Sequence, residues 1–171
     1  MLVRRSNEKG ITLVELLVAM FLMVVCLAVV NTLFAFGLKS YFLYMDRVEV
    51  QENLRIGINR ISREVRLASQ LLSCDNSGRG RITFKVVDDS NEDVISYAIK
   101  VSGDSEAAYQ LIRSVNGFGN NPVARYVHKL AVIPDQVGPD TRTVTLILTG
   151  EKGNSGEMEV STTVTLKNYQ R

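Results

Sequence analysis

The stretch of sequence that decides the fold runs from residue 11 to residue 38 and reads ITLVELLVAMFLMVVCLAVVNTLFAFGL. From Leu16 to Leu38 it contains 23 consecutive residues without a charge. A helix rises about 1.5 Å per residue, so this run is long enough to cross roughly 30 Å of hydrocarbon. The sequence therefore predicts a membrane-spanning helix near the N-terminus rather than a purely soluble protein.

The rest of the chain has the size and composition of one modest globular domain. Of the 171 residues, 46% are apolar and 22% are charged, which excludes a disordered chain or a disulfide-dense scaffold. The first ten residues hold Arg4, Arg5 and Lys9 against Glu8, and this excess accounts for the whole net charge of +2. Because the remaining charges balance, we predict no specific nucleic-acid partner.

The basic N-terminal residues also predict how the helix is oriented. Positively charged flanks stay in the cytoplasm, so the N-terminus should be cytoplasmic and the following domain extracytoplasmic. The apolar run is longer than the 7–15 residues typical of a secretory signal. One alternative remains open, because the small-residue pattern Ala35-Phe36-Gly37 allows late cleavage that would release a secreted binding domain.

Glu15 interrupts the apolar stretch between Val14 and Leu16. A carboxylate within a membrane helix costs about 2 to 3.5 kcal/mol at the bilayer centre and less near its edge, so it favours a partner of opposite charge. The nearest cation, Lys9, is six residues away on a poorly matched face. We therefore expect the partner on another chain, with a carboxylate left among the lipid headgroups as the alternative.

The segment from Lys9 to Ala19, KGITLVELLVA, resembles the cleavage and methylation signal of type IV pilins and type II secretion pseudopilins. The resemblance implies that a prepilin peptidase cuts between Gly10 and Ile11 and methylates the new amine of Ile11. It also implies that Glu15 pairs with the amine of an adjacent subunit during assembly. The implied partners are other pilin or pseudopilin subunits, the prepilin peptidase, an inner-membrane assembly platform and membrane lipid.

The helical pattern continues beyond the apolar run. A stripe with a period near 3.6 is formed by Val50, Leu54, Ile58, Ile61, Val65, Ala68 and Leu72. No proline precedes Pro122, so a single helix is expected from about residue 11 to residue 73. The expected organisation is a basic leader at 1–10, a transmembrane half of the helix at 11–38 and an amphipathic half at 39–73.

From residue 74 to residue 171 the pattern predicts an antiparallel β-sheet domain. Turn-forming residues at 73–80 should end the helix, and alternating apolar residues follow. The expected strands are Arg81–Val87, Val94–Val101, Ala107–Val115, Ala124–Val132, Thr141–Leu148 and Glu157–Leu166. The predicted fold class is α+β and pilin-like, with the long N-terminal helix packed on the sheet.

The end of the chain carries a second resemblance. The segment Thr141–Leu148, followed by Thr162-Thr163-Val164-Thr165-Leu166-Lys167-Asn168, is similar to the final strands of J-type pseudopilins and W-type minor pilins. This resemblance implies a minor subunit. The membrane half also lacks the mid-helix proline of many pilins and has Asn31 and Thr32 near that place, which fits the same interpretation.

Other candidate sites are weaker. Asp89, Asn91 and Asp93 alternate as calcium ligands do, but Val94 stands where a calcium loop has its glycine, so a solvated hairpin loop is the main expectation. The single histidine, His128, excludes metal sites that need two histidines, and no nucleophile motif surrounds Cys74. We predict no enzyme activity, no cofactor and no metal.

Two hypotheses for function follow. The first is a minor pilin or pseudopilin that joins or primes a filament used in secretion, adhesion or DNA uptake. The alternative is an uncleaved, single-pass membrane protein with an extracytoplasmic binding or sensor domain. Removal of residues 1–10 separates the two hypotheses, because a plain anchor keeps its basic leader.

Overall fold

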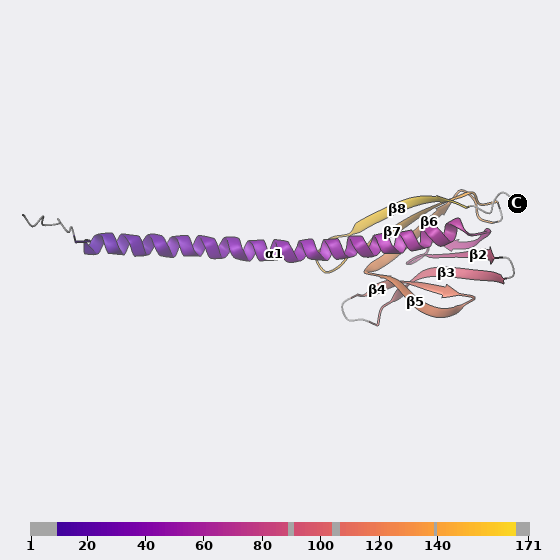
Figure 1. Ribbon diagram of the computed structural model, residues 1–171, viewed down its shortest axis with the longest axis horizontal. Coiled ribbons are helices and arrows are strands. Elements are labelled where there is room, and N and C mark those ends of the chain that lie inside the picture. The colour runs from indigo at the N-terminus through magenta and orange to yellow at the C-terminus, as the bar shows by residue number, and fades with distance from the viewer. Residues whose placement is uncertain (1–9, 89–90, 104–106, 139, 167–171) are drawn as a thin grey trace, which may run out of the picture. The chain divides into compact units, whose positions relative to one another are not determined.

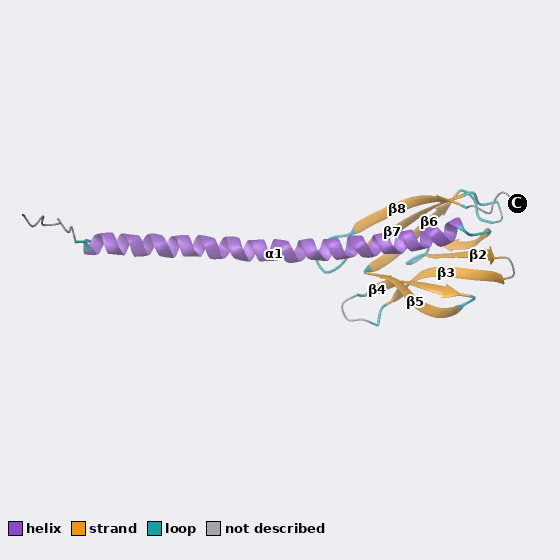
Figure 2. Ribbon diagram, viewed as in Figure 1, coloured by secondary structure: helices purple, strands orange, loops and turns teal. Residues whose placement is uncertain are grey.

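The computed structural model describes residues 10–88, 91–103, 107–138 and 140–166. The chain divides into two units, with the boundary between Phe42 and Leu43. One helix, α1 (Leu13–Arg66), begins in the first unit and ends in the second. The remaining elements are strands joined by loops, which confirms the α+β class (Figure 2).

The first unit consists of the apolar part of α1. Helix α1 starts after Thr12, whose side-chain oxygen accepts a hydrogen bond from the backbone N–H of Glu15 at 3.2 Å. The backbone oxygen of Thr12 accepts a second bond from the N–H of Leu16 at 3.1 Å. Thr12 therefore caps the helix. From Ile11 to Phe42 all the apolar side chains are solvent-exposed, with Ile11 at 76% and Leu22 at 55%.

In the second unit the apolar stripe of α1 is buried. Val50, Leu54 and Ile61 are 0% exposed, and Ile58 and Val65 are 4% and 1% exposed. This confirms the predicted helical stripe over these positions. Gly57 of the same helix also packs closely, because a Cβ at this position would lie 3.0 Å from the side chain of Leu148.

The C-terminal end of the helix was predicted wrongly. Helix α1 ends at Arg66, and residues expected to be helical up to 73 belong instead to strand β1 (Gln70–Asp75). Ser69 leaves the helix because its N–H and hydroxyl both donate to the carbonyl of Lys85, at 2.8 and 3.0 Å. As a result Leu72, expected in the core, is 40% exposed, and its neighbour Leu71 is 1% exposed.

The strands form two antiparallel sheets rather than one. In Figure 1 both sheets lie against the second half of α1. The first sheet has the order β1-β2-β3-β4-β5 and the second the order β6-β7-β8. The bounds are β2 (Arg81–Asp88), β3 (Asn91–Val101), β4 (Tyr109–Val115), β5 (Phe118–Arg125), β6 (Val127–Pro134), β7 (Thr143–Gly150) and β8 (Met158–Thr165).

A single residue separates the two sheets along the chain. The predicted strand Ala124–Val132 is in fact the end of β5, then Tyr126, then β6. Tyr126 has a φ of 60°, a left-handed conformation that side chains other than glycine rarely adopt. The prediction failed here because an alternating pattern continues across Tyr126 while the backbone changes sheets.

The hairpin between β4 and β5 follows a recognisable local signal. Asn116 and Gly117, with φ of 52° and 76°, lie between the two strands. Positive φ at both central residues is the geometry of a tight two-residue hairpin turn, for which Asn-Gly is the preferred sequence. The loop expected over 116–122 is therefore confined to this turn, and Phe118 already belongs to β5.

Two glycines allow close backbone contacts between elements of the second unit. A Cβ atom on Gly80 would lie 1.7 Å from the carbonyl oxygen of Leu130 in β6. A Cβ atom on Gly150 would lie 2.3 Å from the carbonyl oxygen of Tyr126. Because glycine has no Cβ, the turn before β2 and the end of β7 both approach the chain around β6.

Candidate functional site

The peptide bond between Gly10 and Ile11 lies just before the helix. Both residues have no regular secondary structure, and Ile11 is 76% exposed. Among the described residues other than its chain neighbours, no atom lies within 4 Å of the place where a Cβ on Gly10 would stand. The bond is therefore on non-helical, uncovered backbone, which is the kind of segment that a peptidase can bind.

Glu15 lies in the first turn of α1 and is exposed. Thr12 and Glu15 have the spacing of a capping box, and the negative charge suits the positive end of the helix dipole. Within the described residues, the carboxylate of Glu15 has no ion-pair partner. The structure thus places Glu15 four positions from Ile11, in the first turn of α1.

The two polar residues in the middle of the apolar helix bond to their own helix. The side-chain amide of Asn31 donates to the carbonyl of Leu27 at 2.8 Å, and the hydroxyl of Thr32 donates to that of Ala28 at 2.9 Å. These bonds reduce the cost of placing both side chains in lipid. Cys26 is exposed on this helix as a free thiol.

The calcium candidates are not brought together as a described site. Asp89 lies outside the described residues. Asn91 and Asp93 are paired with Asp88 and Val86 in the ladder between β2 and β3. The carboxylate of Asp93 accepts a hydrogen bond from the side chain of Asn116 at 2.9 Å. Among the described residues, no group of three or more side chains is placed to hold a metal.

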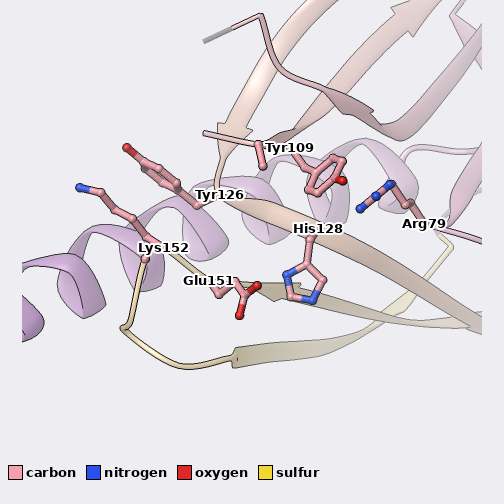
Figure 3. Close-up of a pocket in the computed structure, with 8 residues that line it drawn as sticks. Arg79, Tyr109, Tyr126, His128, Glu151 and Lys152 are labelled. Atoms are coloured by element: carbon pink, nitrogen blue, oxygen red, sulfur yellow. The ribbon is translucent and has the colours of Figure 1, made fainter. Parts of the chain in front are cut away.

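A cavity of about 320 Å³ lies in the second unit, among the turn before β2, the start of β4, the start of β6 and the loop after β7 (Figure 3). At one end the guanidinium of Arg79 lies 3.3 Å from the centre of the Tyr109 ring. Stacking on an aromatic ring orients the guanidinium and leaves its N–H groups able to bind acceptors. Glu151 and His128 line the middle of the cavity, and Tyr126 lines its other end.

His128, near the start of β6, lines this cavity. Its Nε2 lies 3.3 Å from the Oε1 of Glu157. Its Nδ1 is buried and has no hydrogen-bond partner among the described residues. Cys74 is in β1, opposite Ile82, and does not line the cavity, so the structure gives no support to a cysteine–histidine pair.

Ion pairs tie the loop after β7 to helix α1. The amine of Lys152 lies 2.6 Å from the carboxylate of Glu49 and 3.0 Å from that of Asp46. Its hydrogen bonds to Glu49 and Asp46 hold the pKa of Lys152 above its usual value. The Nε of Arg47 also donates to the carbonyl of Ser155 at 2.9 Å.

Tyr126 lies beside these charges, with the Lys152 amine 5.2 Å from the centre of its ring. Burial raises the pKa of Tyr126, and the negative charge of Glu49 raises it further. Sequence reasoning missed this cluster because no local pattern links residues 46–49 with residues 152–155. The contacts exist only after β7 and β8 have folded onto the helix.

Comparison with known proteins gives one match. Residues 5–31 match the prokaryotic N-terminal methylation motif. No curated protein and no solved structure matches the chain. The matched segment contains Gly10, Ile11 and Glu15 and continues into the exposed apolar part of α1.

The motif, the apolar helix that follows it and the helix-packed sheets define a membrane-anchored α+β protein with an N-terminal methylation signal. The match to this motif supports a type IV pilin-like or pseudopilin-like protein. Its apolar helix is consistent with anchoring in the inner membrane.

Proposed function

We propose that this protein is a minor pilin or pseudopilin, a structural subunit that joins or primes a type IV pilus or a type II secretion pseudopilus. The role is one of assembly and requires no catalysis by the chain itself. The match to the methylation motif at residues 5–31 carries this proposal. The absence of proline between Ile11 and Arg66 and the resemblance of the last strands to J-type pseudopilins and W-type minor pilins support a minor subunit.

In the proposed pathway the leader, residues 1–10, remains in the cytoplasm until prepilin peptidase cuts after Gly10 and methylates Ile11. Residues 11–38 hold the subunit in the inner membrane, while residues 74–171 and the second half of α1 are extracytoplasmic. Glu15 then pairs with the N-terminal amine of a neighbouring subunit. That pairing would remove an unpaired carboxylate from the lipid at the moment of assembly.

Processing is tested by the intact mass and N-terminal sequence of the protein extracted from membranes of a host that contains a prepilin peptidase. The expected result is a chain that starts at Ile11 and carries one methyl group. A Gly10→Val variant provides the control, because its side chain should block cleavage while the helix is unchanged. Native protein that still starts at Met1 or Leu2 in this host would contradict the proposal.

Assembly is tested separately with Glu15→Leu. We expect this variant to insert into the membrane normally and to lose co-purification with partner subunits, because the amine of the neighbour no longer has a counter-charge. Glu52→Leu is a matched control, since Glu52 is an exposed carboxylate of the same helix. Normal co-purification of the Glu15→Leu protein would overturn the role of Glu15.

A second function is favoured by the cavity beside Arg79 and His128. An uncleaved, membrane-anchored binding or sensor protein would use a cavity of this kind, about 320 Å³ in volume and lined by polar and aromatic side chains, for a small ligand. The same N-terminal analysis decides between the two functions. A retained leader would favour the sensor, and a methylated Ile11 would favour the filament subunit.

A further inference from the structure

A groove of about 510 Å³ lies in the second unit, between α1 and the hairpin of β4 and β5. Three arginines line it, Arg60 and Arg63 from α1 and Arg113 from β4. Apolar side chains from both elements complete the surface, namely Ile56, Pro122 and Val123. We call this surface, defined by these six residues, the arginine groove.

Glu64 holds two of the three arginines in place. The Nε of Arg113 lies 2.9 Å from one carboxylate oxygen of Glu64 and 3.1 Å from the other. The Nε of Arg60 lies 3.0 Å from Oε1 of the same carboxylate. A guanidinium has five N–H donors, so these contacts orient both groups and leave terminal N–H donors for another acceptor.

The charge of the arginine groove is not balanced from within. Arg60 and Arg113 share the single carboxylate of Glu64, and Arg63 forms no ion pair or hydrogen bond within the described part of the chain. Glu64 has only 14% of its side chain exposed, so it acts mainly beneath the surface. Burial, and next to it the charge of Glu64, raise the pKa of Tyr97, so its hydroxyl stays neutral and does not change the sign of the groove.

The remaining features indicate what kind of ligand the groove fits. β5 is the edge strand of its sheet, but Pro122 has no N–H to donate, which disfavours addition of another strand. No aromatic side chain lines the groove, although nucleic-acid sites without sequence preference commonly use aromatic rings to stack bases. Apolar side chains lie beside the arginines, as in surfaces that bind protein chains.

We propose that the arginine groove docks an acidic, extended segment of a partner protein. Carboxylates of that segment pair with Arg63 and with the outer N–H groups of Arg60 and Arg113. Its apolar side chains contact Ile56 and Val123. The docking depends only on residues of the second unit, so it does not require cleavage after Gly10, and its failure leaves the proposed assembly function untouched.

Binding is measured by fluorescence anisotropy with the full chain in uncharged detergent micelles. The probe is a fluorescein-labelled peptide of alternating glutamate and leucine, and the control peptide carries glutamine in place of glutamate. We expect saturable binding of the glutamate peptide that weakens with added salt, and at least about tenfold weaker binding of the glutamine peptide.

The site of binding is tested by charge reversal. Arg63→Glu should weaken binding of the glutamate peptide at least about tenfold, because an exposed arginine without an internal partner is replaced by a repelling charge. Arg55→Glu is the matched control, since Arg55 is exposed on the same helix but outside the groove, and it should change binding less than about twofold. Near-ultraviolet circular dichroism of both variants checks that the domain is folded.

Three results would overturn the proposal. The first is the absence of saturable binding to the glutamate peptide. The second is an equal loss of binding in Arg55→Glu and Arg63→Glu, which would show that the peptide responds to the net charge of the protein and not to the groove. The third is tighter, Arg63-dependent binding of an oligothymidine of the same net charge, which would identify the groove as a nucleic-acid site instead.

Discussion

Both halves of helix α1 are rich in apolar residues, but the first half exposes its apolar side chains and the second half buries an apolar stripe. Up to Phe42 each large apolar side chain is exposed, as Leu22 is at 55%. Beyond Leu43 the apolar stripe is covered by the sheets, and Leu54 is 0% exposed. The second half therefore finds its apolar partner within the chain, whereas the first half needs one from lipid or from other subunits.

The largest expected effect comes from truncating one leucine in each half. Leu54→Ala should lower the free energy of unfolding of the domain by about 2 to 5 kcal/mol, because it leaves a cavity in the core. Leu22→Ala should leave that free energy unchanged. Urea unfolding followed by near-ultraviolet circular dichroism measures both. Equal effects of the two substitutions would show that the halves do not differ in the way described.

Substitution of one glycine in each half tests the same comparison by adding volume instead of removing it. A Cβ on Gly57 would lie 3.0 Å from Leu148 and 3.2 Å from Leu111 and Ala124, whereas a Cβ on Gly37 would meet nothing within 4 Å. Gly57→Val should destabilise the domain by about 1 to 3 kcal/mol through overpacking. Gly37→Val should cost the domain nothing in the same unfolding experiment. A stable Gly57→Val protein would mean that the packing between helix and sheets can yield.

Within the second half of α1, Glu64 and Glu52 differ in how their carboxylates are placed, since Glu64 is 14% exposed and Glu52 is on the exposed face. Glu64 binds Arg60 and Arg113, and Glu64→Gln should cost about 1 to 2 kcal/mol because two oriented arginines lose their charged acceptor. Glu52→Gln, an exposed substitution on the same helix, should stay within about 0.5 kcal/mol of the native protein. Thermal unfolding of the three proteins in parallel gives the ranking. If Glu64→Gln lowers the free energy of unfolding no more than Glu52→Gln does, the structural role of Glu64 is contradicted.

The smallest effect is expected from Lys152, which joins the loop after β7 to α1. Its pKa is raised in the folded protein by hydrogen bonds to Glu49 and Asp46, so the folded state keeps a proton that the unfolded state loses above about pH 10.4. The contribution is therefore complete below that pH and declines as pH rises. All three side chains are partly exposed, with Lys152 at 24%, Asp46 at 31% and Glu49 at 41%, so screening by solvent limits the contribution to less than about 1 kcal/mol.

Lys152→Met tests this contribution. At neutral pH the variant should be slightly less stable than the native protein. The difference should shrink above about pH 10.4, because the unfolded native chain then loses its Lys152 proton while the folded state still holds it, which favours unfolding. Unfolding free energies measured in urea at several pH values give the comparison. A difference that grows with pH would contradict the sign derived from the ion pairs.

The parts of this structure that local sequence patterns predict are those in which local preference and tertiary packing agree. The stripe through Val50, Leu54 and Ile61 is confirmed because helical periodicity and burial coincide there. The end of the helix was misplaced because Ser69 bonds to Lys85, a residue of another element, and such a contact has no local signature. Tyr126 shows the same limit, since its left-handed backbone interrupts an otherwise regular alternation.

The candidate sites also differ in whether a local sequence signal defines them. Gly10, Ile11 and Glu15 were predicted as site residues because they belong to a short contiguous signal, and they lie within the motif matched at residues 5–31. The cavity beside Arg79 and the arginine groove were not predicted. Each is assembled from elements far apart in sequence, such as Arg63 on α1 and Arg113 on β4. Only the folded chain brings such residues together.

The strand order has a consequence for the speed and order of folding. Within each sheet every strand pairs with its neighbour in sequence, so all strand pairs are closed by short connections. Hairpins of this kind form before contacts that require large loops to close. The slow step is then expected to be the docking of β6, β7 and β8 against a helix that was synthesised long before them, and that late contact is where misfolding would begin.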